Sequence, residues 1–186
     1  MTQARMIRAK LAVPISEERD HVRGPRVAPV TLVEYGDYEC PYCGQAYFVV
    51  KELERRAGNL MRFVFRNFPL TTVHPHAERA VEAAEAAGAQ GKFWEMHDIL
   101  YENQQALEGE DLLEYAALVG LDIPRFVREM REGRYLNRMR EDFLSGARSG
   151  VNGTRTFFIN GLRHDGAWDL ATLMAAIENA AGAGRR

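Results

Sequence analysis

A strand–helix–strand region and a later pair of β-type stretches flank a long helical block. This order constrains the fold of the 186-residue chain more than any other feature. Residues 29–36 and 61–69 are short, apolar and rich in β-branched or aromatic side chains, and 41–57 between them has helical spacing. Residues 75–150 read as helical almost throughout, and β signals return at 156–164. Because a strand, helix and strand joined in this way suit a parallel crossover, we expect one α/β sheet with an all-helical insertion.

Apolar spacing and glycines divide the block into shorter helices at 75–88, 93–101 and 111–119, with two more beginning near Pro124 and Arg134. The last of these has apolar side chains at helical spacing, which predicts its buried face. That face consists of Tyr135, Leu136, Met139, Phe143 and Ala147.

The C-terminal part predicts a hairpin followed by a helix. Asn160 and Gly161 form the turn dipeptide most typical of a two-residue hairpin, between strands expected at 156–159 and 162–164. Asp169 is a suitable cap for a final helix that buries Leu170 and the apolar residues after it. The full order is therefore βαβ, helices, ββα.

The length and composition favour a single domain and exclude some classes of partner. We expect an N-terminal extension at 1–28 and one domain at 29–182, with the helical insertion at about 70–150. A formal net charge of −2 makes binding to nucleic acid or an anionic membrane surface unfavourable. The sequence lacks an apolar run suited to a secretory signal or a membrane helix, so we expect a cytoplasmic, bacterial protein.

The only two cysteines, Cys40 and Cys43, are the candidate chemical site. Pro41 suits the first turn of the helix at 41–57, so Cys40 is expected at the helix start, where unpaired N–H groups and the helix dipole stabilise a thiolate. Cys43 lies one turn further in and is better shielded. We therefore assign Cys40 as the nucleophile and Cys43 as the resolving thiol of a redox couple.

Other interpretations of the cysteine pair remain open. A zinc site needs four ligands, and His74 and His76 could complete one only if the fold brought them near. A metal or cluster shared between two chains is a further possibility, as is a buried, inactive pair of thiols. We expect no resident metal or other cofactor.

Three stretches, 28–44 with its Cys-Pro-Tyr-Cys motif, 93–103, and 149–166 with Gly-Thr-Arg-Thr-Phe-Phe-Ile-Asn-Gly, resemble the DsbA-like branch of the thioredoxin superfamily. The resemblance extends over about 20–180. It implies a thioredoxin-like fold and thiol–disulfide oxidoreductase activity on protein or small-thiol disulfides, with an unidentified thiol or disulfide redox partner. In that family the first cysteine attacks and the second resolves.

The chain departs from the family pattern at one position. The family usually has Gly-Thr-Pro-Thr with a cis proline beside the cysteines, whereas residues 153–156 are Gly-Thr-Arg-Thr. A cis bond before Arg155 would cost about 3–4 kcal/mol, so we expect a trans bond or an altered loop. We expect Pro41 and Tyr42, together with Thr154 and Arg155, to support the site or bind substrate.

The arginine also leaves two alternative functions open. Loss of efficient exchange would make the chain a redox-inactive binding or chaperone-like module. An arginine near a reactive sulfur would also suit peroxide reduction, although the residues before Cys40 do not resemble a peroxiredoxin.

Charged residues near Cys40 would act on its thiolate in opposite directions. A guanidinium at Arg155 would favour the Cys40 thiolate, and the carboxylates of Asp37 and Glu39 would disfavour it. The direction of exchange stays undecided, with reduction or isomerisation better suited to a cytoplasmic protein.

Overall fold

A five-stranded sheet with the order β1-β3-β2-β4-β5 forms the centre of the protein. The computed structural model describes residues 9–184. Strands β2 and β3 are parallel, and the other neighbours are antiparallel. This arrangement confirms the predicted α/β class and the crossover between the first two predicted strands. The strands are β1 (His21–Arg23), β2 (Val30–Gly36), β3 (Met61–Asn67), β4 (Thr156–Ile159) and β5 (Leu162–Arg163).

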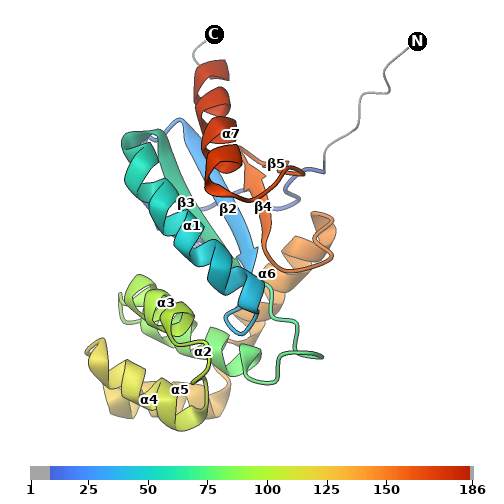
Figure 1. The fold of residues 1–186 in the computed structure, drawn as a ribbon. Coiled ribbons are helices and arrows are strands. Elements are labelled where there is room, and N and C mark those ends of the chain that lie inside the picture. The colour runs from blue at the N-terminus through green and yellow to red at the C-terminus, as the bar shows by residue number, and fades with distance from the viewer. Residues whose placement is uncertain (1–8, 185–186) are drawn as a thin grey trace.

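Helices cover both faces of the sheet (Figure 1). Helices α1 (Pro41–Ala57) and α7 (Leu170–Ala183) pack together on one face, and α6 (Leu136–Arg148) packs on the other against β3. Strand β2 is buried along its whole length, with Leu32 in the core beneath α1 and α7 and Val33 in the opposite core. Because side chains alternate along a strand, Glu34 shares the face of Leu32 and points toward the α1 side.

The insertion forms a helical layer at one end of the sheet (Figure 1). A short 3-10 turn, η1 (Gly58–Leu60), precedes β3, and the inserted helices follow β3. The buried residues of these helices belong to the same core as those of α1. Most predicted boundaries are correct to within about two residues, the usual uncertainty of a frayed helix end. The inserted helices are α2 (Ala77–Gly88), α3 (Phe93–Glu102), α4 (Gly109–Leu118) and α5 (Ile123–Glu132).

The segment predicted as an N-terminal extension also contributes to the sheet. Strand β1 pairs antiparallel with β3, placing His21 opposite Phe65. Just before this strand, the buried Asp20 carboxylate accepts hydrogen bonds from Nε and Nη2 of Arg66, both at 2.9 Å. A strand of three residues is too short to show alternation, so the sequence pattern did not reveal it. The proposed domain boundaries at 28 and 182 remain predictions.

The predicted buried face of α6 is partly wrong. Met139 is buried, but Phe143 is 36% exposed and Ala147 lies at the surface. The buried side is instead polar: Asp142 accepts hydrogen bonds from Arg138 Nη1 at 2.6 Å and from the backbone N–H of Asn67 at 3.0 Å. These partners satisfy the carboxylate, so the helix can turn a charged residue inward.

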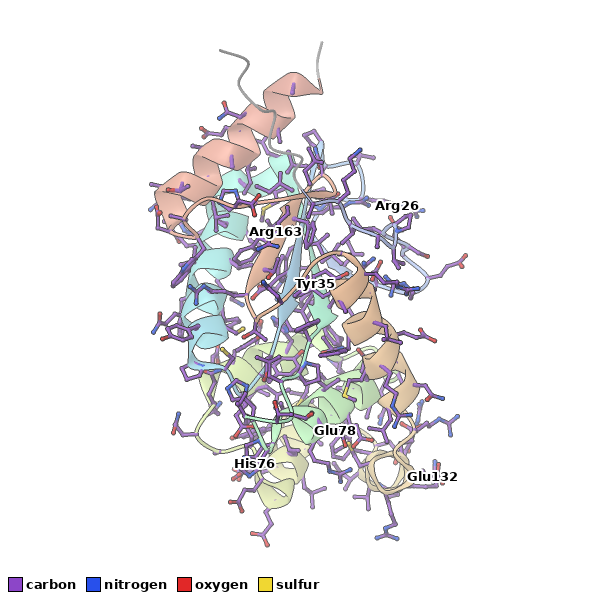
Figure 2. The ribbon with its side chains drawn as sticks, turned by 90° about the vertical axis from the view of Figure 1, so that its right-hand side faces the viewer. Arg26, Tyr35, His76, Glu78, Glu132 and Arg163 are labelled. Atoms are coloured by element: carbon purple, nitrogen blue, oxygen red, sulfur yellow. The ribbon has the colours of Figure 1, made fainter. Side chains whose placement is uncertain are left out.

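A hydroxyl pair extends the polar contact between α6 and the sheet. The Tyr35 hydroxyl and Ser145 Oγ lie 2.8 Å apart, and Figure 2 shows Tyr35 in the region between the sheet and α6.

The predicted hairpin and final helix are confirmed. Asn160 and Gly161 have φ of 47° and 78°, the left-handed values that a tight hairpin turn requires. Asp169 Oδ1 accepts a hydrogen bond from the N–H of Thr172 at 3.0 Å and caps α7. Within the described residues, every helix is too short or too polar to cross a lipid bilayer.

Candidate active site

Cys40 and Cys43 lie at the start of α1, four and seven residues after the end of β2 at Gly36. Cys40 is the N-cap residue, with extended backbone angles, and Pro41 is the first helical residue, as predicted. Both cysteines are free thiols; Cys40 is 4% exposed and Cys43 is fully buried. The sulfur at the helix end is thus the more accessible one.

The surroundings stabilise the thiolate of Cys40. The Cys43 thiol donates a hydrogen bond to it, and the Thr154 hydroxyl donates another, with Oγ1 3.1 Å from Sγ. Backbone N–H groups of Cys43 and Tyr42 add to these, and together they outweigh partial burial and lower the pKa of Cys40 to about 5. The same hydrogen bond, with burial, raises the pKa of Cys43 well above its ordinary value. Of the two sulfurs, Cys40 is therefore the one that is ionised at neutral pH.

Glu34 is a buried carboxylic acid close to the cysteine pair. It is 2% exposed, and its Oε1 has no hydrogen-bond partner among the described residues. Burial raises the pKa of Glu34 to about 8, with the Arg155 charge opposing the rise and the Cys40 thiolate adding to it. Glu34 in turn helps to raise the pKa of Cys43. It is thus an internal proton-holding group coupled to both sulfurs.

Two histidine–carboxylate pairs hold the loop before Cys40. His74 Nδ1 lies 2.7 Å from Asp37 Oδ2, and His76 Nδ1 lies 2.9 Å from Glu39 Oε1. Asp37 also accepts a hydrogen bond from the N–H of Leu70 at 2.8 Å. Figure 2 shows His76 below the sheet, where the chain approaches α2. The carboxylates expected to disfavour the thiolate are therefore paired with histidines.

A glutamine from the insertion fixes the other side of the cysteine loop. Gln104 Nε2 donates to the carbonyl oxygens of Tyr38 at 2.8 Å and Cys40 at 2.9 Å. The Gln104 side chain occupies the space that a Cβ at Gly44 would need, so glycine is required there for this contact. The helical insertion thereby helps to define the start of α1.

Arg155 lies beside the motif but donates no hydrogen bond to either sulfur among the described atoms. Its guanidinium carbon is 5.0 Å from the ring centroid of Tyr42 and 3.9 Å from that of Trp168. The described chain has no cis peptide bond, and Arg155 has φ of 52°. The expected trans bond is thus present, together with a left-handed backbone that is unusual for a residue with a side chain.

The structure brings the predicted site residues together. Pro41 and Tyr42 are exposed at the helix start, and Thr154 and Arg155 approach from the loop before β4. The two histidines considered as metal ligands bind carboxylates, and among residues 9–184 no group of three or more His, Cys, Asp or Glu is arranged to hold a metal ion.

Three supporting residues were not predicted: Glu34, Gln104 and Trp168. Glu34 had a detectable signal, since it is a charged residue inside an otherwise apolar, buried strand. Gln104 and Trp168 lie 64 and 128 residues after Cys40 in sequence, and nothing in the local patterns marks them.

A family model described as Thioredoxin matches residues 16–179. A thioredoxin-like oxidoreductase from Silicibacter pomeroyi is 29% identical, with a TM-score of 0.74 over 87% of this chain and 92% of that one. BdbD from Bacillus subtilis, in its oxidised form, has a TM-score of 0.81 over 94% of this chain and 97% of that one, at 20% identity.

A third similarity is to part of a much larger protein. A Na+/H+ antiporter, NhaA 1 of Salinispora arenicola, is 53% identical over 170 residues, which cover 91% of this chain and 26% of the antiporter. The chain thus spans about a quarter of the length of that relative.

Proposed function

Because the chain belongs to the thioredoxin family and has the fold of the DsbA-like proteins, we propose that it is a thiol–disulfide oxidoreductase that cycles Cys40 and Cys43 between dithiol and disulfide. The observation that carries this proposal is the Cys40 sulfur at the start of α1, with the Thr154 hydroxyl 3.1 Å away and a thiol pKa of about 5. Such a sulfur is a thiolate at neutral pH, and the thiolate is the reactive form.

The reduced protein acts in two steps. The Cys40 thiolate attacks one sulfur of a substrate disulfide; the substrate S–S bond breaks, a mixed disulfide forms, and the leaving thiolate takes a proton from solvent. The Cys43 thiol then loses its proton and attacks Cys40 Sγ, which releases the second substrate thiolate. The substrate has gained two electrons and the protein holds a Cys40–Cys43 disulfide. In the opposite direction, the oxidised protein accepts electrons from a dithiol through the same intermediate.

Glu34 is the candidate to take the proton that Cys43 loses. The Cys40 thiolate raises the pKa of Glu34 in the resting protein. When the mixed disulfide forms, that negative charge disappears, so Glu34 ionises more readily at the moment when Cys43 needs a base. The positive charge of Arg155 also lowers the pKa of Glu34 and so favours the ionised carboxylate.

Single cysteine variants test the proposal. Cys40→Ser is expected to abolish turnover of a model protein disulfide while leaving the circular dichroism spectrum unchanged. Cys43→Ser is expected to accumulate the mixed disulfide with that protein, detectable by mass spectrometry. Full activity in Cys40→Ser would contradict the proposal, and so would the absence of any adduct in Cys43→Ser.

A second candidate role is that of a redox unit working with a Na+/H+ antiporter, and the identity shared with part of an NhaA protein favours it. The test is to incubate Cys43→Ser with membranes that contain such an antiporter lacking the region matched by this chain. A mixed disulfide between Cys40 and the transporter would support the role. A transporter that forms no adduct and whose ion exchange is unchanged by the oxidised protein would count against it.

A further inference from the structure

The guanidinium of Arg155 is held in place by aromatic rings rather than by an acid. It lies 3.9 Å from the Trp168 centroid and 5.0 Å from the Tyr42 centroid, and Tyr42 is 60% exposed between the two cysteines. Stacking on two rings restrains the side chain while leaving the edge of the guanidinium available for hydrogen bonds. An arginine restrained in this way loses little further side-chain entropy when it binds a ligand.

The donors of Arg155 have no partner among the described residues. The guanidinium makes no ion pair and donates no hydrogen bond to any of them, and its Nε is buried and unpartnered. The acids on either side of Trp168 are already engaged: Asp165 lies 3.0 Å from Arg163 Nε, and Asp169 accepts from the N–H and hydroxyl of Thr172. The one acid whose pKa responds clearly to the Arg155 charge, Glu34, is buried.

Arg155 is also next in sequence to a residue that contacts the reacting sulfur. It directly follows Thr154, whose hydroxyl contacts Cys40 Sγ at 3.1 Å. A polypeptide whose disulfide reaches that sulfur must pass beside Tyr42 and the loop that carries Arg155. Side chains next to the attacked cysteine therefore come within reach of a cation that has no surface acid of its own.

We propose that Arg155 selects polypeptide disulfides that carry an Asp or Glu side chain next to the attacked cysteine. The planar guanidinium can form two parallel hydrogen bonds with a carboxylate, and this geometry is unavailable to a neutral amide. The pairing fixes the register of the substrate chain on the loop before β4. The assignment concerns substrate choice and rests on the proposed exchange at Cys40.

Matched peptides test this selection. Three peptides with one internal disulfide are made identical except for the residue beside one cysteine, which is Asp, Asn or Lys. Because the Asn peptide loses hydrogen bonds between two charged groups, the wild type is expected to turn over the Asp peptide at least about tenfold faster, in kcat/KM, than the Asn peptide. The Lys peptide is expected to be the slowest.

Variants assign the preference to Arg155. Arg155→Met keeps a side chain of similar length at the same backbone position and is expected to turn over all three peptides at similar rates. Arg155→Lys keeps the charge without the planar fork, so an intermediate preference is expected. Arg56→Met, which removes a surface cation in the last turn of α1, is the matched control and is expected to retain the wild-type order. Equal rates for the Asp and Asn peptides in the wild type would overturn the assignment, as would a preference that survives in Arg155→Met.

Binding measurements separate this selection from the exchange reaction. The same peptides with both cysteines replaced by serine cannot react, and their affinities are measured by calorimetry with wild type and Arg155→Met. Tighter binding of the Asp peptide to the wild type alone supports the role of Arg155 even if no disulfide peptide reacts, in which case the proposed exchange is what fails. Disulfide turnover with equal affinities and equal rates leaves the exchange standing and rejects the role of Arg155.

Discussion

The low pKa of Cys40, on which the proposed function depends, comes from a few hydrogen bonds to one sulfur. Cys40 was identified from the sequence because a helix start after a buried strand is a favourable place for a thiolate. Thr154 was assigned a supporting role through the family resemblance, and the structure adds its contact with the sulfur. Glu34 was missed although a charged residue inside an apolar strand was a signal, because its position close to the cysteine pair depends on tertiary contacts.

Thr154→Val tests the contribution of the hydroxyl. The variant keeps the shape of the side chain and removes the donor to Cys40 Sγ, so the pKa of Cys40 is expected to rise by about one unit, the equivalent of one hydrogen bond to a charged group. The readout is the pH dependence of iodoacetamide labelling of Cys40. Thr154→Ser, which keeps the hydroxyl, is expected to label like the wild type. An unchanged profile in Thr154→Val would show that the contact is unimportant for reactivity.

Glu34→Gln is expected to stabilise the protein and slow its exchange. The folded pKa of Glu34, about 8, is above its ordinary value of 4.5, so the carboxylate destabilises the fold increasingly as the pH rises from about 4.5 to about 8. Replacing the ionisable carboxyl should raise the free energy of unfolding by about 3 kcal/mol near pH 7 and by little near pH 4.5. Denaturant titrations at these two pH values provide the measurement.

The matched control for this prediction is Glu178→Gln, at an exposed position on α7. It should change stability equally little at both pH values. A Glu34→Gln variant without a pH-dependent gain would contradict the raised pKa, and an undiminished rate of exchange would contradict its role as the proton acceptor.

At the scale of elements, local patterns were sufficient for the parallel crossover, the hairpin and most helices. They were insufficient where tertiary polar contacts decide burial. The inward face of α6 carries Asp142 because Arg138 and the backbone of Asn67 donate hydrogen bonds to its carboxylate, whereas apolar spacing alone predicted that Phe143 would be buried.

The loop at Arg155 also depends on tertiary contacts. Its left-handed backbone follows from the surroundings, and proline, which requires a φ near about −65°, does not fit this conformation. Arg155→Pro would therefore change the loop as well as the charge.

His74, in the loop after β3, pairs with Asp37, in the loop before Cys40, and this pair should make the stability of the protein depend on pH. Burial lowers the pKa of His74, but the hydrogen bond and the charge of Asp37 outweigh burial, so the pKa of His74 is raised. The pair therefore contributes stability below about pH 6.5 that is lost as the pH rises through the folded pKa. His74→Asn should destabilise the protein by about 1 kcal/mol near pH 6 and by less near pH 9. Denaturant titrations at both pH values measure this.

His164→Asn is the comparison variant, because His164 Nε2 contacts the carbonyl of Ala167 and no carboxylate. Its effect should be small at both pH values. If His74→Asn costs as much at high pH as at low pH, the ion pair with Asp37 is not the source of the stability.

At the scale of the whole molecule, the two redox states should respond differently to pH. The Cys40 thiolate has a pKa of about 5, below its unfolded value, so it stabilises the reduced fold increasingly between about pH 5 and pH 8.5. The oxidised protein lacks this thiolate. The difference in unfolding free energy between the reduced and oxidised states should therefore grow in favour of the reduced state by about 1 kcal/mol per pH unit. Parallel pH curves for the two states would contradict this linkage.

The same linkage bears on the direction of exchange. Stabilisation of the reduced form makes a dithiol–disulfide pair a stronger oxidant. We therefore expect the reduction potential of the Cys40–Cys43 pair to lie above that of a typical thioredoxin, which is a change from the reductase or isomerase direction favoured by the sequence. Equilibration with glutathione buffers of known ratio measures this potential.

The most direct test of the account is the ionisation of Cys40 in the reduced wild-type protein. The ultraviolet absorbance of the thiolate is followed across pH, with the oxidised protein and Cys40→Ser as references. We predict a transition near pH 5 that is present in the reduced wild type and absent from both references. A sulfur that ionises only near about pH 8.5, as in an unstructured peptide, would contradict the claim that the start of α1 and the Thr154 hydroxyl make Cys40 reactive.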